Sequence, residues 1–245
     1  MIIKELKWDS NFFGYKVGRF NASNLLERDS SEILKIVKNH NFKLVYIFAS
    51  NKEIVKDEEK EILKRKVNEI KAKLVDEKVV FSKFPTNYDN FSENIKPYYD
   101  TVENRETLYK LAILSGKYSR FKLDENFSYH QFVKMYKTWV DNSINQTFAD
   151  KIFIYEKNDV LCGFVTIKKT SRNTANIGLI AVDEDYQGLN IGRNLIKHCE
   201  KYCIENNFKE LTVPTQMQNM GAVKFYEKSG FSIKEIIQVY HLWSF

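Results

Sequence analysis

The sequence predicts an α/β (α+β) fold in two parts that divide near residue 115. Three observations favour this fold class. Apolar runs of strand length alternate along the chain with amphipathic stretches of helix length. A short apolar strand at residues 177–182 runs through a glycine-containing loop into a helix. Between the two parts, residues 86–105 are polar and rich in tyrosine and have no clear period.

The N-terminal part, residues 1–115, alternates helices and strands. A helix is expected at 31–39, a strand at 43–49 and a strand at 73–84. The run Lys52 to Lys78 mixes both signs of charge, which is typical of a solvated helix rather than a nucleic-acid face. Its apolar residues form the predicted buried stripe: Ile54, Ile62, Leu63, Val67 and Ile70.

The C-terminal part, residues 116–245, carries most of the predicted strands. A helix is expected at 127–140, and strands at 151–156, 161–168, 176–182, 211–215 and 233–242. The helix after Ile191 buries Leu195, Cys199, Tyr202 and Cys203. Its other side is expected to be solvated: Arg193, Lys197, His198, Glu200 and Lys201.

Composition narrows the class of protein. Hydrophobic residues make up 43% of the 245, and no apolar run approaches the ~20 residues that span a bilayer. The start lacks a signal-peptide core, and three cysteines suit a reducing compartment, so a cytoplasmic protein is expected. Cys199 and Cys203 lie beside His198, but without a second cluster of ligands we expect no metal. The net charge of +6 is spread along the chain and suits anionic substrates.

The loop Gln187-Gly188-Leu189-Asn190-Ile191-Gly192-Arg193 follows a strand and opens a helix. Free backbone N–H groups at a helix start bind phosphates, and glycines allow close approach of the chain. The loop lacks the Gly-Lys-Ser/Thr of a nucleotide-triphosphate site and the G-x-G-x-x-G of a dinucleotide site. A tight turn without a ligand is the alternative.

A second motif begins at Asn219 and ends at Phe231. Asn219 and Tyr226 are seven residues apart, so they share one face of a helix, and Gly230 stands where a C-terminal cap belongs. An ordinary helix, capped by Asn219 and with Tyr226 in the core, is the alternative. The order and separation of the two motifs favour a functional site.

Together the two motifs resemble the GNAT superfamily of acyl-CoA-dependent N-acyltransferases. Its pyrophosphate loop reads Gln/Arg-x-x-Gly-x-Gly/Ala, although Asn190 stands where the family usually has glycine, and its second signature reads N-x-x-A-x-x-F-Y-E-K-x-G-F. Asparagine tolerates a left-handed backbone, so the loop can keep its shape. The resemblance implies a mixed central sheet, acetyl-CoA or another acyl-CoA as co-substrate, and Tyr226 as the acid that protonates the leaving thiolate.

The same resemblance assigns the cofactor contacts. It implies that backbone groups of the strand before the loop bind the pantetheine arm and the thioester oxygen. The expected cofactor-binding residues are Ile180, Ala181, Val182, Gln187, Gly188, Leu189, Asn190, Ile191, Gly192, Arg193, Asn219, Ala222 and Phe225. No general base is assigned, because none of the four histidines has a recognisable partner.

A narrower resemblance covers nearly the whole chain. Trp8 to Gly14 and Ser119 to Asp124 look like dTDP-fucosamine acetyltransferases, in which a degenerate N-terminal α/β domain precedes the GNAT domain. It implies that residues 1–115 lie on the substrate side and that the acceptor is the amine of a dTDP-linked amino-dideoxy sugar. Arg120, Tyr98 and Tyr99 are the substrate candidates, with packing and a surface ion pair of Arg120 and Asp124 as alternatives.

Other functions stay open. The enzyme could act on a protein N-terminus, a polyamine or an antibiotic, or the chain could be a non-catalytic CoA-binding module. An intact Asn219 and Tyr226 pair argues against the last. The aromatic end of the chain, Val239 to Phe245, suggests a subunit contact and hence a homodimer.

Overall fold

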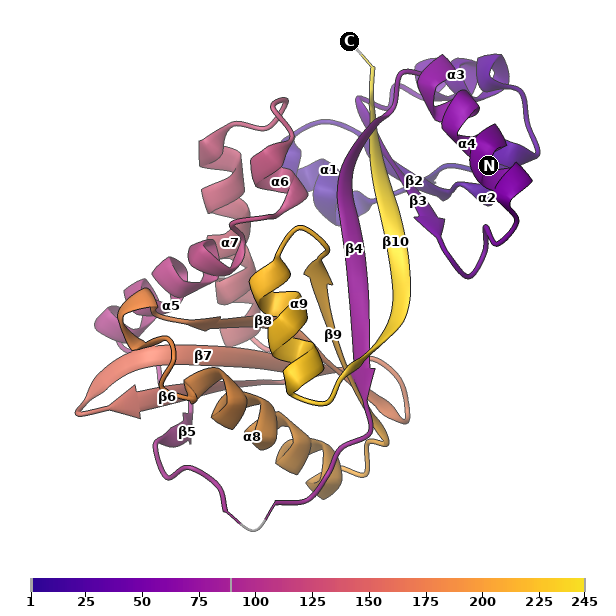
Figure 1. Ribbon diagram of the computed structural model, residues 1–245. Coiled ribbons are helices and arrows are strands. Elements are labelled where there is room, and N and C mark those ends of the chain that lie inside the picture. The colour runs from indigo at the N-terminus through magenta and orange to yellow at the C-terminus, as the bar shows by residue number, and fades with distance from the viewer. Residues whose placement is uncertain (1, 89, 245) are drawn as a thin grey trace. The chain divides into compact units, whose positions relative to one another are not determined.

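The structure is a computed structural model that describes residues 2–88 and 90–244, and its chain divides into two compact units (Figure 1). The first unit holds residues 2–79, 216–218 and 235–244, and the second holds 80–88, 90–215 and 219–234. The chain passes from one unit to the other within β4 (Lys73–Lys83) and within β10 (Ser232–Trp243). Phe245, the end of the strand expected in a subunit contact, lies outside the described residues.

The units group residues by packing and divide after residue 79 rather than near residue 115. The end of the chain belongs to the first unit because β10 pairs with β3, from Ile237 opposite Ser50 to Trp243 opposite Leu44. The separation of a substrate-side domain at 1–115 from a catalytic domain at 116–245 is a statement about roles, and it stays a prediction.

The first unit is a sheet covered by helices. Its strands lie in the order β1-β2-β3-β10, with β2 and β3 parallel and the other pairs antiparallel. The elements are β1 (Lys4–Glu5), α1 (Lys7–Phe13), β2 (Val17–Asn21), α2 (Ser23–Leu26), α3 (Ser30–Asn39), β3 (Leu44–Ser50) and α4 (Asp57–Glu69). The predicted stripe is confirmed for Ile54, Leu63, Val67 and Ile70, which are buried in one core with Ile33 of α3 and Ile47 of β3. Ile62, the fifth member, is half-buried.

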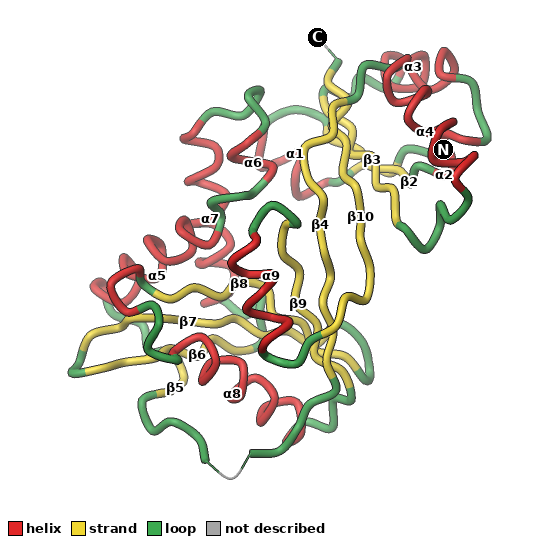
Figure 2. Tube along the Cα trace, in the orientation of Figure 1, coloured by secondary structure: helices red, strands yellow, loops and turns green. Residues whose placement is uncertain are grey.

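The second unit contains the predicted mixed sheet (Figure 2). Its strands lie in the order β9-β8-β7-β6-β5; β8 and β9 are parallel and the other pairs are antiparallel. The strands are β5 (Ile95–Pro97), β6 (Lys151–Lys157), β7 (Val160–Lys169), β8 (Thr174–Val182) and β9 (Glu210–Gln216). The helices are α5 (Val102–Ser115), α6 (Arg120–Leu123), α7 (Tyr129–Ile144), the 3-10 turn Glu184–Tyr186, α8 (Ile191–Glu205) and α9 (Met220–Lys228).

Helices cover both faces of this sheet. A Cβ atom added to Gly163 of β7 would lie 3.1 Å from the side chain of Ile191, so α8 packs closely against that face. On the other face, a Cβ on Gly178 of β8 would meet Thr166 and Phe148, which follows α7. The strand ends that lead into the cofactor loop therefore lie between two helical layers.

Candidate active site

The two parallel strands of the second unit form a fork. β8 and β9 pair at Thr174–Asn176 and Glu210–Thr212, and in the described chain their pairing ends there. Residues 177–182 of β8 continue antiparallel to β7, while β9 no longer pairs with them. An unpaired strand edge offers N–H and C=O groups to an extended ligand.

A β-bulge in β8 decides which backbone groups face the fork. Val165 pairs with Ile180 and Ile167 with Ile177, so Gly178 and Leu179 share one position opposite Thr166. The Thr166 hydroxyl takes up the freed donor, accepting from Leu179 N at 2.8 Å. No pattern in the sequence predicts this role of Thr166.

The register beyond the bulge fixes the direction of each amide. Asp183 N donates to Cys162 O at 2.8 Å, so that pair is hydrogen-bonded and its neighbours alternate. Ala181 therefore bonds to Phe164 of β7, whereas the N–H and C=O groups of Ile180 and Val182 point into the fork. Of the three expected strand contacts, Ile180 can offer its N–H and C=O groups there and Val182 its N–H, because the Val182 carbonyl accepts from Gln187 Nε2.

The predicted phosphate loop has the backbone that its residue types suggest. Gly188 has φ 80° with open space around it, and Asn190 has φ 60° and ψ 11°, the left-handed conformation expected for it. Asn190 caps α8 without a side-chain hydrogen bond, so its side chain leaves the first N–H groups of this 15-residue helix uncapped. Gln187 holds the loop to β8 through Nε2, which donates to Val182 O at 3.2 Å.

α8 and α9 pack closely where the loop ends. A Cβ on Gly192 would lie 3.1 Å from the ring of Phe225, so the absence of a side chain lets α9 approach the first turn of α8. Arg193 and Leu189 are exposed beside this contact, and Leu189 is 49% exposed. The two sequence motifs thus meet through Gly192 and Phe225.

α9 ends with the glycine cap that the sequence predicted, and it begins with the Asn219 cap that belonged to the alternative of an ordinary helix. Asn219 accepts from Ala222 N through Oδ1 at 3.2 Å, so it is an N-cap, and its amide nitrogen bonds to no residue that the structure describes. At the other end Phe231 N donates to Tyr226 O and Gly230 N donates to Glu227 O, both at 3.0 Å. With Gly230 at φ 84° this is a Schellman cap, and it fixes Tyr226 against Phe231.

Tyr226 lies in an aromatic pocket of the second unit and is 4% exposed. Its ring centroid is 5.6 Å from that of Phe81, 5.3 Å from Phe225 and 5.8 Å from Phe231. Burial, and then the nearby Cys199 thiol, raise the pKa of the Tyr226 hydroxyl well above its ordinary value. The phenol therefore stays protonated at neutral pH and can act only as a donor of a proton, not as a base.

Glu200 of α8 is fully buried, so the expectation that it lies on the solvated side of the helix is wrong. Lys83 Nζ lies 2.8 Å from Glu200 Oε1, and the backbone and side chain of Thr86 donate to Oε2 at 2.9 and 2.8 Å. Lys83 also donates to Ser229 O at 3.0 Å, at the end of α9. Partners 114 and 117 residues earlier in the chain draw this carboxylate inside, which helical periodicity does not reveal.

The substrate candidates are spread over two places in the second unit. The Tyr99 hydroxyl donates to Glu156 Oε1 at 2.6 Å and the Tyr98 hydroxyl to Asp100 Oδ1 at 2.7 Å, beside β5. Arg120 begins α6 and lies over the Phe121 ring, 4.6 Å from its centroid. Their role in binding a substrate stays a prediction.

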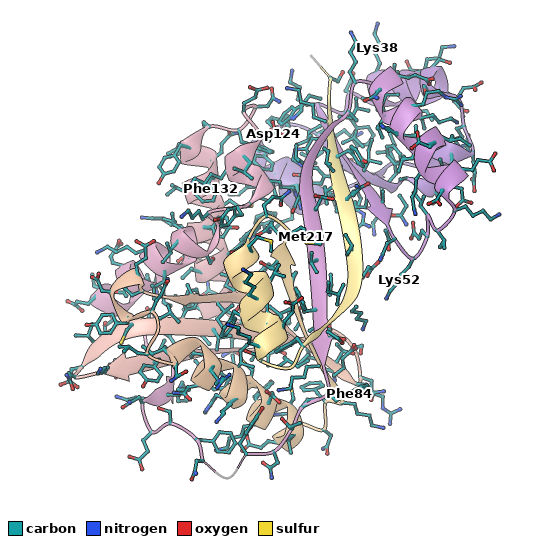
Figure 3. The ribbon with its side chains drawn as sticks, viewed as in Figure 1. Lys38, Lys52, Phe84, Asp124, Phe132 and Met217 are labelled. Carbon is teal, nitrogen blue, oxygen red and sulfur yellow. The ribbon has the colours of Figure 1, made fainter. Side chains whose placement is uncertain are left out.

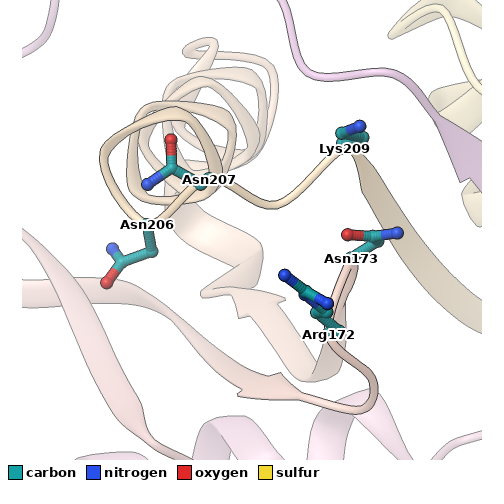
Figure 4. A pocket seen from close by; sticks show the side chains of 5 residues that line it. All are labelled: Arg172, Asn173, Asn206, Asn207 and Lys209. Carbon is teal, nitrogen blue, oxygen red and sulfur yellow. The ribbon is translucent and has the colours of Figure 1, made fainter.

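Other features lie away from the fork. A cavity of about 420 Å³ opens at the far end of α8, about 22 Å from the loop by helix length, and exposed residues line it (Figure 4). The lining residues are Arg172, Asn173, Asn206, Asn207 and Lys209. His198 is half-buried, edge-on to Phe153, rather than solvated. Among the described residues there is no group of three His, Cys, Asp or Glu side chains placed to hold a metal, and no helix could cross a membrane.

Comparisons with known proteins agree with this arrangement. Residues 118–231 match the model of the acetyltransferase (GNAT) family. The spore coat polysaccharide biosynthesis protein SpsD of Bacillus subtilis (strain 168) is 26% identical over 139 residues, which are 56% of this chain and 47% of that protein. The dTDP-fucosamine acetyltransferase of Escherichia coli O6:H1 is 26% identical over 102 residues, 41% of this chain and 43% of that one. The chain thus spans about half the length of these relatives.

A solved structure supports the fold. The GCN5-related N-acetyltransferase from Sphaerobacter thermophilus aligns with 86% of this chain and 64% of its own, with a TM-score of 0.53 at 12% identity. The expected GNAT fold, with its mixed sheet, is thereby confirmed.

Proposed function

The chain contains a GNAT acetyltransferase domain, and from this premise we propose that it is an N-acyltransferase that uses acetyl-CoA or another acyl-CoA. The acceptor we propose is the primary amine of a nucleotide-linked amino-dideoxy sugar of the dTDP-4-amino-4,6-dideoxyhexose type. The observation that supports the transferase proposal is the fork: backbone groups of β8 face into it, and the same strand leads through the loop into the uncapped start of α8.

Each group has a part in the proposed reaction. The first N–H groups of α8 bind the pyrophosphate, and the fork edge of β8 pairs with the amides of the pantetheine arm. The amine nitrogen attacks the thioester carbonyl, whose oxygen is stabilised by a backbone N–H of the fork. As the C–S bond breaks, the thiolate takes its proton from the Tyr226 hydroxyl. The amine loses its own proton to a base or water that we do not assign.

The sugar-nucleotide part of the proposal is supported by two relatives and by composition. One relative is by name a dTDP-fucosamine acetyltransferase and the other a polysaccharide biosynthesis protein. The net charge of +6 suits an anionic nucleotide sugar. Three free, buried cysteines fit the cytoplasm, where we propose that the reaction takes place. A homodimer through the last strand remains a prediction.

The test is release of free thiol from acetyl-CoA in the presence of candidate amines. The acceptors are dTDP-4-amino-4,6-dideoxygalactose, its glucose epimer and the 3-amino isomers, with spermidine and lysine peptides as controls. Turnover confined to one dTDP sugar supports the proposal and identifies the amine. Turnover with the control amines alone supports the N-acyltransferase proposal and rejects the nucleotide sugar as the acceptor. CoA binding without any thiol release favours a non-catalytic module.

A further inference from the structure

Pro214 stands in β9 at the position where the fork opens. Thr170 N donates to Thr174 O at 2.9 Å, so the bonding groups of residues 174 and 176 point toward β7. The backbone groups of the alternate residues, Ala175 and Ile177, therefore point toward β9. The direction of these two carbonyls decides how far the parallel pairing can continue.

The register then shows which bond is missing. With Ala175 opposite Leu211, the carbonyl of Ala175 accepts from the N–H of Thr212 in a parallel ladder. The next carbonyl that faces β9, that of Ile177, would accept from residue 214 in the same way. Proline has no N–H, so Pro214 cannot donate, and the ladder has to end at this rung.

A side chain supplies the missing donor. Asn176 Nδ2 donates to Ile177 O at 3.0 Å, which satisfies the carbonyl that Pro214 leaves open. Thr212 fixes the orientation of this amide, since its hydroxyl lies 3.0 Å from Asn176 Oδ1 and 3.3 Å from Ala175 O. Thr212 is 7% exposed, so the hydrogen bonds at the apex of the fork are shielded from water.

We propose that Pro214 and Asn176 are positioning residues that hold the fork open for the cofactor. Pro214 stops β9 from pairing with β8 beyond Thr212. Asn176 donates to the Ile177 carbonyl, so that this carbonyl does not accept from another donor. The backbone groups of Ile180 and the N–H of Val182 then stay available to the pantetheine arm. This inference rests on the proposed function, because it assigns the open fork to acyl-CoA.

The experiment replaces Pro214 with alanine, which restores the N–H. In Pro214→Ala the ladder gains a rung, so the amide of residue 214 exchanges with solvent at least tenfold more slowly than an unpaired amide. Affinity for CoA, measured by isothermal titration, falls about tenfold, while the melting temperature stays the same or rises. Pro97→Ala is the matched control, because Pro97 also lies in a strand, β5, but outside the fork; its affinity for CoA is that of the wild type.

A second comparison tests Asn176 without the cofactor. Asn176→Leu lowers the melting temperature of the wild-type chain, and lowers it less in the Pro214→Ala background, where a backbone N–H replaces the lost amide. If Asn176→Leu lowers the melting temperature equally in both backgrounds, Asn176 does not replace the donor that Pro214 lacks, and this part of the inference is overturned. If the amide of residue 214 in Pro214→Ala exchanges as fast as an unpaired amide, the inference is overturned. It is also overturned if the wild type binds CoA and Pro214→Ala binds it equally well. Neither result affects the proposed function. A wild type that binds no CoA overturns the proposed function, whereas the exchange result at residue 214 is independent of it.

Discussion

Lys83 and Glu200 form an ion pair inside the second unit: the Nζ–Oε1 distance is 2.8 Å, and the two side chains are 12% and 0% exposed. Burial lowers the pKa of Lys83, but hydrogen bonds to Glu200 and Tyr88 outweigh it and hold the pKa above its ordinary value. The next side chain, Phe84, is 80% exposed (Figure 3). Lys83 thus connects the end of β4 to α8 through Glu200 and to the end of α9 through Ser229 O.

Replacement of Lys83 by methionine is expected to destabilise the protein strongly. It leaves a carboxylate buried without its cation, which costs on the order of 3–5 kcal/mol. The free energy of unfolding from urea denaturation measures the loss. Lys60→Met is the matched control: its pair with Asp57 is exposed to solvent and screened, so the change should have little effect on stability. Equal decreases in the free energy of unfolding for the two variants would show that the buried pair contributes no more to stability than the exposed one.

Asn190 is expected to tolerate glycine and to reject a β-branched residue. At φ 60° a valine carries a strain of about 1–2 kcal/mol that glycine does not. Asn190→Val should therefore weaken CoA binding while Asn190→Gly keeps it, as isothermal titration would show. Asn207, also at φ 60° but after the other end of α8, is the control: Asn207→Val should lower stability and leave CoA affinity intact. Equal CoA affinity in Asn190→Val and Asn190→Gly would mean that the conformation of this residue does not matter for binding.

The stability of the second unit is expected to fall in acid through Glu156. Burial raises the pKa of this carboxyl, but hydrogen bonds from Lys96 and Tyr99 outweigh it and hold the pKa below its ordinary value. A lowered folded pKa means that the carboxylate stabilises the fold above about pH 4.5 and that this contribution is lost as the pH falls through the folded value. Glu156→Gln should flatten the dependence of the unfolding free energy on pH in that window. An unchanged slope would show that the pair with Lys96 contributes nothing.

Ionisation of Tyr226 is expected to cause no decrease in the turnover number on the alkaline side of its pH dependence. Because burial and Cys199 raise its pKa above the ordinary value, its acid form persists as the pH rises through the range where a free tyrosine ionises, about pH 10. The turnover number should show no loss below about pH 10 that is due to this residue. An alkaline limb near pH 9 that depends on Tyr226 would contradict the burial of its hydroxyl.

Local patterns in the sequence were enough to predict the backbone of the loop at residues 187–193 and the C-terminal cap of α9, whereas binding of a cofactor by this loop stays a prediction. Gly188, Asn190 and Gly230 need left-handed backbone, and residue type alone indicates this. α5 was not predicted: its buried residues Leu108, Leu111 and Ala112 have helical spacing, but Ile113 and Leu114 beside them blur the apolar stripe.

Contacts between distant segments could not be predicted in the same way. Glu200 is held inside by Lys83 and Thr86, and β10 pairs with β3 from Ile237 opposite Ser50, residues that are far apart in the chain. The hydrophobic periodicity of the sequence predicts neither of these contacts. One long-range feature did leave a signal: a proline inside the strand that contains Val213 and Thr215 indicates that its ladder ends there.

The most direct test of the account compares thiol release and CoA binding in the wild type and in Tyr226→Phe. The account predicts that the turnover number falls by roughly 10²–10⁴ in the variant, since the leaving thiolate loses its proton donor, while the dissociation constant for CoA stays within about threefold. Tyr129→Phe removes a hydroxyl from a residue that is 66% exposed on α7, and it should keep both values. Wild-type turnover in Tyr226→Phe would contradict the account and remove this tyrosine from the reaction.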